Sequence, residues 1–158
     1  FSDYAQQLEM ESIGKQANPN SIFKNTGQII FGGFGSTAQH SYFQLLHQGT
    51  ACACADIFTI ESNKDTNKML YAQSQAQAGL LANGPHEELE SFEQVNGNVP
   101  TNLFTLKELN PKTLGFLIAT WEHRTYVTAK MLQINPFDQY GVSAGKIFAK
   151  KYLDEHGG

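Results

Sequence analysis

The sequence predicts an α/β fold, in which a mostly parallel β-sheet has helices on both faces. Segments with helical periodicity alternate along the chain with short apolar segments, an order that favours parallel strands joined by helices. The short segments are apolar rather than half polar, which is typical of strands buried on both faces. The 158 residues, 41% of them hydrophobic, suit one domain with its own core.

A helix, a strand and a second helix are expected at the start of the chain. Residues 1–11 are expected to be helical because Tyr4 and Leu8 fall on one apolar stripe. Residues 28–31 form an apolar run that ends at a glycine-rich turn, as a buried strand does. The next helix is expected over residues 38–47, after hydroxyl residues that can cap it and before a glycine.

The middle of the chain is expected to add a second strand and further helices. Residues 51–60 alternate enough for a strand, in which Cys52 and Cys54 would be small apolar core residues. Neither a disulfide framework nor a zinc-binding spacing is present. An Ala- and Gln-rich helix is expected over residues 67–81, and residues 86–93 are a candidate for a short helix.

A third strand and two helices complete the expected order. Residues 102–106 are the third strand candidate. A long, largely buried helix opens at Asn110-Pro111, because proline is well placed in a first turn, and it ends at Asn135-Pro136. The last helix is expected over residues 138–153.

Composition argues against two classes of partner. A formal net charge of −4 and a pI of about 5.7 argue against a broad nucleic-acid surface. Apolar runs such as residues 117–119 are far shorter than the roughly 20 residues that cross a bilayer. Two cysteines without a disulfide-forming pattern fit a reducing compartment, and we expect no signal peptide. We therefore expect a cytoplasmic domain that binds neither nucleic acid nor membranes.

The first candidate site is in the N-terminal helix. Gln7 and Glu11 are four residues apart, so they share one helix face, one turn apart. A carboxylate beside a neutral amide can hold a hydroxylated ligand and move a proton. The same spacing also fits an ordinary solvated helix face, and spacing alone does not separate the two interpretations.

The second candidate site follows the glycine run. His40 is expected in the first turn of the next helix, where the helix dipole disfavours its protonated form, so a neutral imidazole could exchange a proton. The alternative is a half-buried histidine bonded to backbone. Ser36 and Gln39 match a capping box, which is a purely structural use. No dinucleotide or P-loop motif accompanies the glycines.

The third candidate site is in the last helix. Gln139 and Lys146 are seven residues apart, almost two turns, and are expected to share a face. Gln139 would lie near the helix N-terminus, a favourable place for an anion such as phosphate, and Lys146 would add a positive charge. We interpret Glu122-His123-Arg124, which interrupts an apolar helix, as an internal ion pair rather than a site.

Together these segments resemble the phosphoglucose isomerase (glucose-6-phosphate isomerase) family, in its C-terminal sugar-isomerase (SIS) domain. The resemblance covers nearly the whole chain and preserves the order of its landmarks. They are Tyr4–Ser12, Gln39-His40-Ser41, Gln44–Thr50, Gly115–Ala119, Glu122-His123, Phe137–Val142 and Lys146. It implies a SIS-type, flavodoxin-like sheet and interconversion of glucose 6-phosphate and fructose 6-phosphate, a step of glycolysis and gluconeogenesis, without cofactor or metal.

The resemblance also implies a role for each candidate residue. Glu11, in Met10-Glu11-Ser12, matches the base that carries a proton between C2 and C1 through an enediol. Gln7 and Gln139 match substrate-binding glutamines. His40 and Lys146 match the groups that help open the sugar ring, with His40 contributed across a homodimer interface.

The chain also departs from the family pattern. Ile13 replaces an asparagine, Val99 stands where an arginine is common, and the segment from residue 56 to residue 70 is short. The resemblance makes residues 1–158 a C-terminal SIS domain without its N-terminal partner domain, so we expect little isomerase activity from the chain alone. A non-catalytic sugar-phosphate-binding module is the alternative function, and a purely structural surface is a third.

Overall fold

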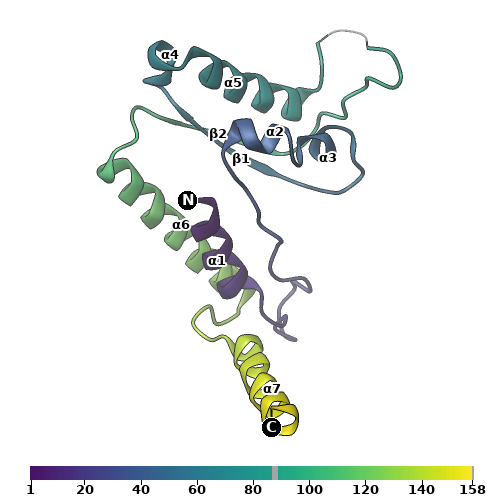
Figure 1. Ribbon diagram of the computed structural model, residues 1–158, viewed down its shortest axis with the longest axis vertical. Helices are drawn as coiled ribbons and strands as arrows, with labels where there is room; N and C mark the ends of the chain where they lie inside the picture. Colours follow the sequence, from purple (N-terminus) through teal and green to yellow (C-terminus); the bar gives the residue numbers. More distant parts are fainter. Residues whose placement is uncertain (87–88, 158) are drawn as a thin grey trace. The chain divides into compact units, whose positions relative to one another are not determined.

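The computed structural model describes residues 1–86 and 89–157 (Figure 1). The chain divides into two compact units, which are described separately. One unit contains Phe1–Phe31 and the chain from Leu117 onward, and the other contains Gly32–Phe116. No helix in the described residues is long and apolar enough to cross a membrane.

The unit Gly32–Phe116 is built around two parallel strands. Strand β1 (Ala55–Ile60) pairs with β2 (Thr101–Leu106), and Ala55 lies opposite Thr101. The rings of Phe58 and Phe104 stack across the pair, 5.0 Å apart. Parallel strands need a long crossover, and here it contains a helix. The predicted α/β class with a parallel sheet is therefore confirmed.

Helix α5 (Lys68–Asn83) forms the main part of this crossover, after the short helix α4 (Asn63–Thr66). The Asn67 side chain caps α5 by accepting a hydrogen bond from a backbone N–H. The helix packs on the sheet, where the Ser74 hydroxyl donates to the Thr59 hydroxyl at 2.7 Å. The prediction of a helix over residues 67–81 is confirmed, whereas α4 was not predicted.

The predicted helix over residues 38–47 is divided into two short helices. Helix α2 is Gly35–Gln39, and α3 is Phe43–Gln48. Between them, the backbone N–H of Ser41 bonds to the carbonyl of Ala38 at 3.0 Å. This three-residue spacing tightens the chain into a turn and ends α2 early.

The described residues of the unit made of Phe1–Phe31 and the chain from Leu117 onward contain three helices. Helix α1 (Ser2–Ile13) packs against α6 (Pro111–Leu132), which enters this unit at Leu117, and α7 (Tyr140–His156) follows. The ring of Phe1 meets the buried indole of Trp121 edge-on, with centroids 5.2 Å apart. All three helices were predicted, but α6 is not largely buried as expected. Its buried residues form a single stripe at intervals of four, namely Leu117, Trp121, Thr125 and Ala129.

The strand predicted at residues 28–31 does not form. Ile29 and Phe31 are 83% and 51% exposed, and in the described chain this segment pairs with no strand. The Ile30 carbonyl accepts a hydrogen bond from the Gln6 side chain at 2.6 Å instead. A strand is stable only when a neighbouring strand satisfies its backbone groups, and here the Gln6 side chain bonds just one of them.

Two further predictions need correction. Cys52 and Cys54 are exposed, and they precede β1 because the strand begins only at Ala55. The predicted helix over residues 86–93 falls partly outside the described residues, and its described residues are not helical. Residues 91–93 form a turn.

Candidate functional site

Helix α1 presents Gln7 and Glu11 together on an exposed face. The Gln7 Nε2 lies 3.5 Å from Glu11 Oε1, as the four-residue spacing predicts, so the shared face is confirmed. Both residues are exposed. The pair thus offers an amide donor and a carboxylate acceptor to a ligand approaching from solvent.

An open hollow of about 240 Å³ lies beside this pair. It is lined by Tyr4, Gln7, Leu8, Glu11 and Ser12, all from α1. The Tyr4 hydroxyl donates a hydrogen bond to Glu122 Oε1 on α6 at 2.8 Å. Burial raises the pKa of Tyr4, and the hydrogen bond and charge of Glu122 raise it further, so the hydroxyl stays protonated as a donor at neutral pH.

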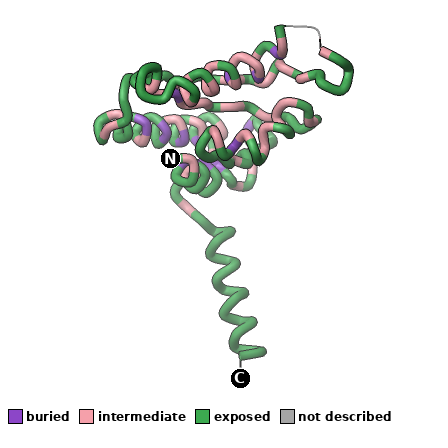
Figure 2. The backbone as a smooth tube through the Cα atoms, turned by 45° about the horizontal axis from the view of Figure 1, so that its top comes forward, coloured by how far each residue is buried: buried purple, intermediate pink, exposed green. Residues whose placement is uncertain are grey.

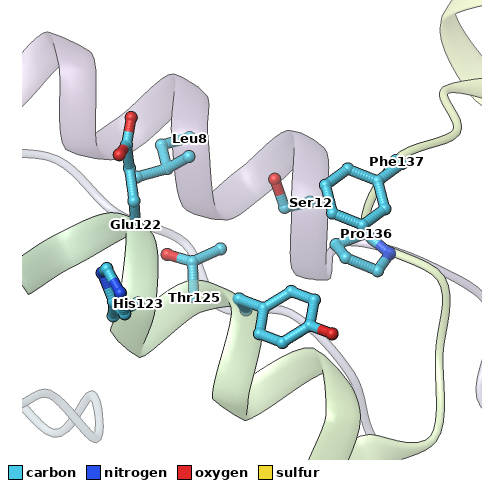
Figure 3. Close-up of a pocket in the computed structure, with 8 residues that line it drawn as sticks. Leu8, Ser12, Glu122, His123, Thr125, Pro136 and Phe137 are labelled. Atoms are coloured by element: carbon cyan, nitrogen blue, oxygen red, sulfur yellow. The ribbon is translucent and has the colours of Figure 1, made fainter. Parts of the chain in front are cut away.

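A second hollow, of about 420 Å³, shares Leu8 and Ser12 with the first (Figure 3). Its other walls come from α6 and from the loop that contains Pro136 and Phe137. The lining is mostly apolar. The hydroxyl of Thr125 is buried there and has no hydrogen-bond partner among the described residues. The hollow thus extends the open face of α1 toward α6.

The opposite side of α1 is buried and contains a charged pair. Ala5, Glu9 and Ile13 follow at intervals of four and are all buried. Glu9, only 2% exposed, accepts a hydrogen bond from Arg124 of α6 and forms an ion pair with it. The predicted apolar stripe through Tyr4 is therefore wrong, because Tyr4 is 37% exposed and the buried stripe is displaced by one residue.

The interpretation of Glu122-His123-Arg124 as an internal ion pair holds for Arg124, but its partner is the buried Glu9 of α1 and lies outside the triplet. Arg124 pairs with Glu9, and Glu122 accepts from Tyr4, so both reach α1 rather than each other. The His123 ring bonds the Ala119 carbonyl at 2.7 Å. Glu9 was not among the predicted site residues. Its position could have indicated its burial, because it lies four residues from both Ala5 and Ile13 and shares their helix face.

The last helix begins later than predicted. Helix α7 starts at Tyr140 with Gln139 as its N-cap, and Lys146 lies on the helix; both side chains are exposed. Lys15, just beyond α1, donates to the Glu11 carbonyl at 2.6 Å and pairs with Asp138 Oδ1 at 3.5 Å. This contact connects the end of α1 to the start of α7.

His40 lies at the end of a helix rather than at its beginning. It is exposed and is the C-cap of α2, because that helix begins at Gly35 and has Phe34 as its N-cap. The argument from a helix N-terminus therefore does not apply to His40. The capping box of Ser36 and Gln39 does not form either, since both residues lie inside the helix.

Of the five predicted site residues, Gln7 and Glu11 are the two that the structure brings together. Gln139 and Lys146 belong to the same unit, and His40 belongs to the other. Among the described residues, no cluster of His, Cys, Asp and Glu side chains fits a metal ion.

Comparisons with known proteins agree on one family. Residues 1–157 match the family model for phosphoglucose isomerase. The glucose-6-phosphate isomerase of Acinetobacter baylyi is 41% identical over 177 residues, which cover 97% of this chain and 32% of that protein. The enzyme of the same name from Wigglesworthia glossinidia brevipalpis is 40% identical over 172 residues, covering 96% of this chain and 31% of the relative. The chain thus spans about a third of the length of these relatives.

Solved structures give the same result for the fold. A glucose-6-phosphate isomerase from Chlamydia trachomatis matches with a TM-score of 0.86 at 31% identity, covering 98% of this chain and 32% of that one. A hypothetical protein from Thermus thermophilus, TT0462, matches with a TM-score of 0.73 at 21% identity, covering 96% of this chain and 38% of that one. The second match supports the fold alone.

Proposed function

Because the chain belongs to the phosphoglucose isomerase family, we propose that it is part of an isomerase that interconverts glucose 6-phosphate and fructose 6-phosphate. The exposed Glu11 carboxylate, with the Gln7 amide 3.5 Å away beside an open hollow, carries the proposal. Such a pair meets the chemical needs of an aldose–ketose conversion, a base for one proton and a donor for sugar hydroxyls.

Glu11 acts as the base in this proposal. Its carboxylate takes the proton from C2 of the open-chain aldose, which leaves an enediol after O1 is protonated. The resulting carboxylic acid returns the proton to C1, and the O2 hydroxyl releases its own proton to water as O2 becomes the ketone. This released proton replaces the one that O1 took up from water, so atoms and charge balance. Gln7 donates to a sugar oxygen and holds C1 and C2 next to the carboxylate. Exposure of both side chains supports this role, since the ligand must reach them.

The remaining site residues prepare the substrate. His40 and Lys146 assist ring opening by exchanging a proton with the ring oxygen and the C1 hydroxyl, and Gln139 contacts the sugar phosphate. In the assembled protein, His40 acts across a homodimer interface. The exposure of all three residues supports these roles. The exposed thiols Cys52 and Cys54 support a reducing, cytoplasmic location.

The chain alone is expected to have little or no isomerase activity. The enediolate formed after proton removal carries negative charge, and stabilising such charge is often the largest catalytic contribution. In the part of the chain that the structure describes, Arg124 is the single arginine, and it pairs with Glu9 on the buried side of α1. In this proposal, a second domain of the full-length protein supplies a further positive group beside the enediolate, in addition to Lys146.

A grafted enzyme tests the function. In it, this chain replaces the matching third of the Acinetobacter baylyi glucose-6-phosphate isomerase. We expect the grafted enzyme to convert fructose 6-phosphate, and Glu11→Gln to lower kcat by about 10²–10⁴-fold while KM stays similar. Glu155→Gln, which removes an exposed carboxylate of α7, is the matched control and should change neither value.

Two results would contradict the proposal. One is a folded grafted enzyme without turnover. The other is full turnover after Glu11→Gln, which would favour a module that binds sugar phosphate without performing chemistry.

A further inference from the structure

The buried side of α1 contains a charged pair that the proposed proton transfer does not use. Glu9 is 2% exposed, and both of its carboxylate oxygens are bonded. Oε1 accepts from the Arg124 guanidinium, and Oε2 accepts from the Gln28 amide at 2.6 Å. Two directional bonds on a buried carboxylate hold it in one orientation.

Helix geometry connects this pair to the open face of α1. Successive residues turn by about 100°, so residues two positions from Glu9 point about 160° away from it. Gln7 and Glu11 are these residues. Any rotation of α1 that moves Glu9 away from Arg124 therefore turns Gln7 and Glu11 by the same angle.

Arg124 is itself held in place by α6. Its guanidinium carbon lies 4.3 Å from the ring centroid of Trp121, an indole that is only 3% exposed. The other buried residues of α1, Ala5 and Ile13, make apolar contacts, which are non-directional and permit small rotations. The directional restraint on the buried side of α1 therefore comes from the Glu9–Arg124 pair, while the Tyr4–Glu122 hydrogen bond restrains the exposed edge of the helix.

We propose that Arg124 is a positioning residue for the isomerase reaction. It acts through buried Glu9 to set the rotation of α1, and this rotation directs the Glu11 carboxylate and the Gln7 amide into the hollow of about 240 Å³. Arg124 touches no substrate in this account. The inference rests on the proposed function, because it assigns a role relative to Glu11.

Turnover of the grafted enzyme tests this role. We expect Arg124→Met to lower kcat about 10–100-fold with KM changed less than about threefold, because small misplacements of a catalytic group have effects of this size. Arg124→Lys keeps the charge opposite Glu9 and should recover at least a third of the original kcat. Lys130→Met removes an exposed charge from the same helix and should leave both values unchanged.

A second variant separates positioning from stability. Leaving Glu9 buried without a partner can unfold the chain, whereas apolar replacement of both members of a buried pair often preserves stability. We expect the double variant Glu9→Leu/Arg124→Leu to fold, with an unfolding midpoint near that of the unaltered protein, and still to lose at least tenfold in kcat. Full kcat in this folded double variant would overturn the inference.

The outcomes distinguish this inference from the proposed function. If the grafted enzyme is active and Glu11→Gln abolishes turnover, but Arg124→Met keeps its kcat, then the positioning role is wrong and the function stands. If the unaltered grafted enzyme folds without turnover, the proposed function fails and the positioning role fails with it.

Discussion

Helices α1 and α7 both contain candidate site residues, but their surroundings differ. Helix α1 buries Ala5, Glu9 and Ile13 against its neighbours. All 17 described residues of α7 are exposed, as Figure 2 shows along the length of the helix that ends at the C-terminus. The chain therefore fixes the direction of Gln7 and Glu11 by its own packing, whereas the described residues provide no such packing for Lys146.

Stability should change most when the aromatic ring that packs against α1 is removed, and hardly at all when a ring of α7 is removed. Trp121→Ala should lower the free energy of unfolding by about 3–5 kcal/mol, because it empties a buried site between α6 and α1. Phe148→Ala on α7 should change it by less than about 0.5 kcal/mol, because that ring is 68% exposed. Urea unfolding of both variants measures the difference. Equal losses would contradict the contrast between the helices.

Removing the Lys15 contacts that connect the end of α1 to the start of α7 should lower the free energy of unfolding by an intermediate amount. Lys15→Met removes the donor that bonds the Glu11 carbonyl and pairs with Asp138. We expect a loss of about 1–2 kcal/mol, because the lysine side chain is 13% exposed and its acceptors lose their partner. The control, Lys150→Met, removes an exposed charge from α7 and should have almost no effect. Thermal unfolding of the two variants provides the measurement.

Local geometry explains which parts of the site were predictable. Two residues four apart on a helix share a face wherever the helix packs, so the spacing of Gln7 and Glu11 was sufficient to predict their proximity. The buried side of α1 was missed because the partner of Glu9 lies 115 residues away, and no local pattern specifies that pair. His40 was misplaced because the helix boundary was set three residues too late.

The same distinction explains the fold. The strands at residues 55–60 and 101–106 were predicted within a few residues, because each is an apolar run with a parallel partner in this chain. Residues 28–31 have an equally strand-like composition, yet among the described residues they pair with no strand. The composition of a segment indicates its tendency to form a strand, whereas strand pairing depends on residues far away in the sequence.

Removing the hydrogen bond between Tyr4 of α1 and Glu122 of α6 should change stability least. The pKa of Tyr4 is raised above its ordinary value of 10.0, by burial first and by Glu122 second. A raised pKa in the folded state gives stability that is present below pH 10 and is lost as pH rises through the folded value. Because Tyr4 is 37% exposed, solvent screening keeps this contribution small. In Tyr4→Phe, alkaline unfolding curves should show a shallower decline above pH 10, and an unchanged decline would contradict the assignment.

We propose above that Glu11 moves the proton between C2 and C1 of the sugar phosphate. The most direct measurement is deuterium incorporation at C1 of fructose 6-phosphate, when the grafted enzyme works in heavy water. We predict incorporation with Glu11 present, and none with Glu11→Gln although that variant still binds the sugar phosphate. Incorporation by the Glu11→Gln variant at the rate of the unaltered protein would contradict the claim.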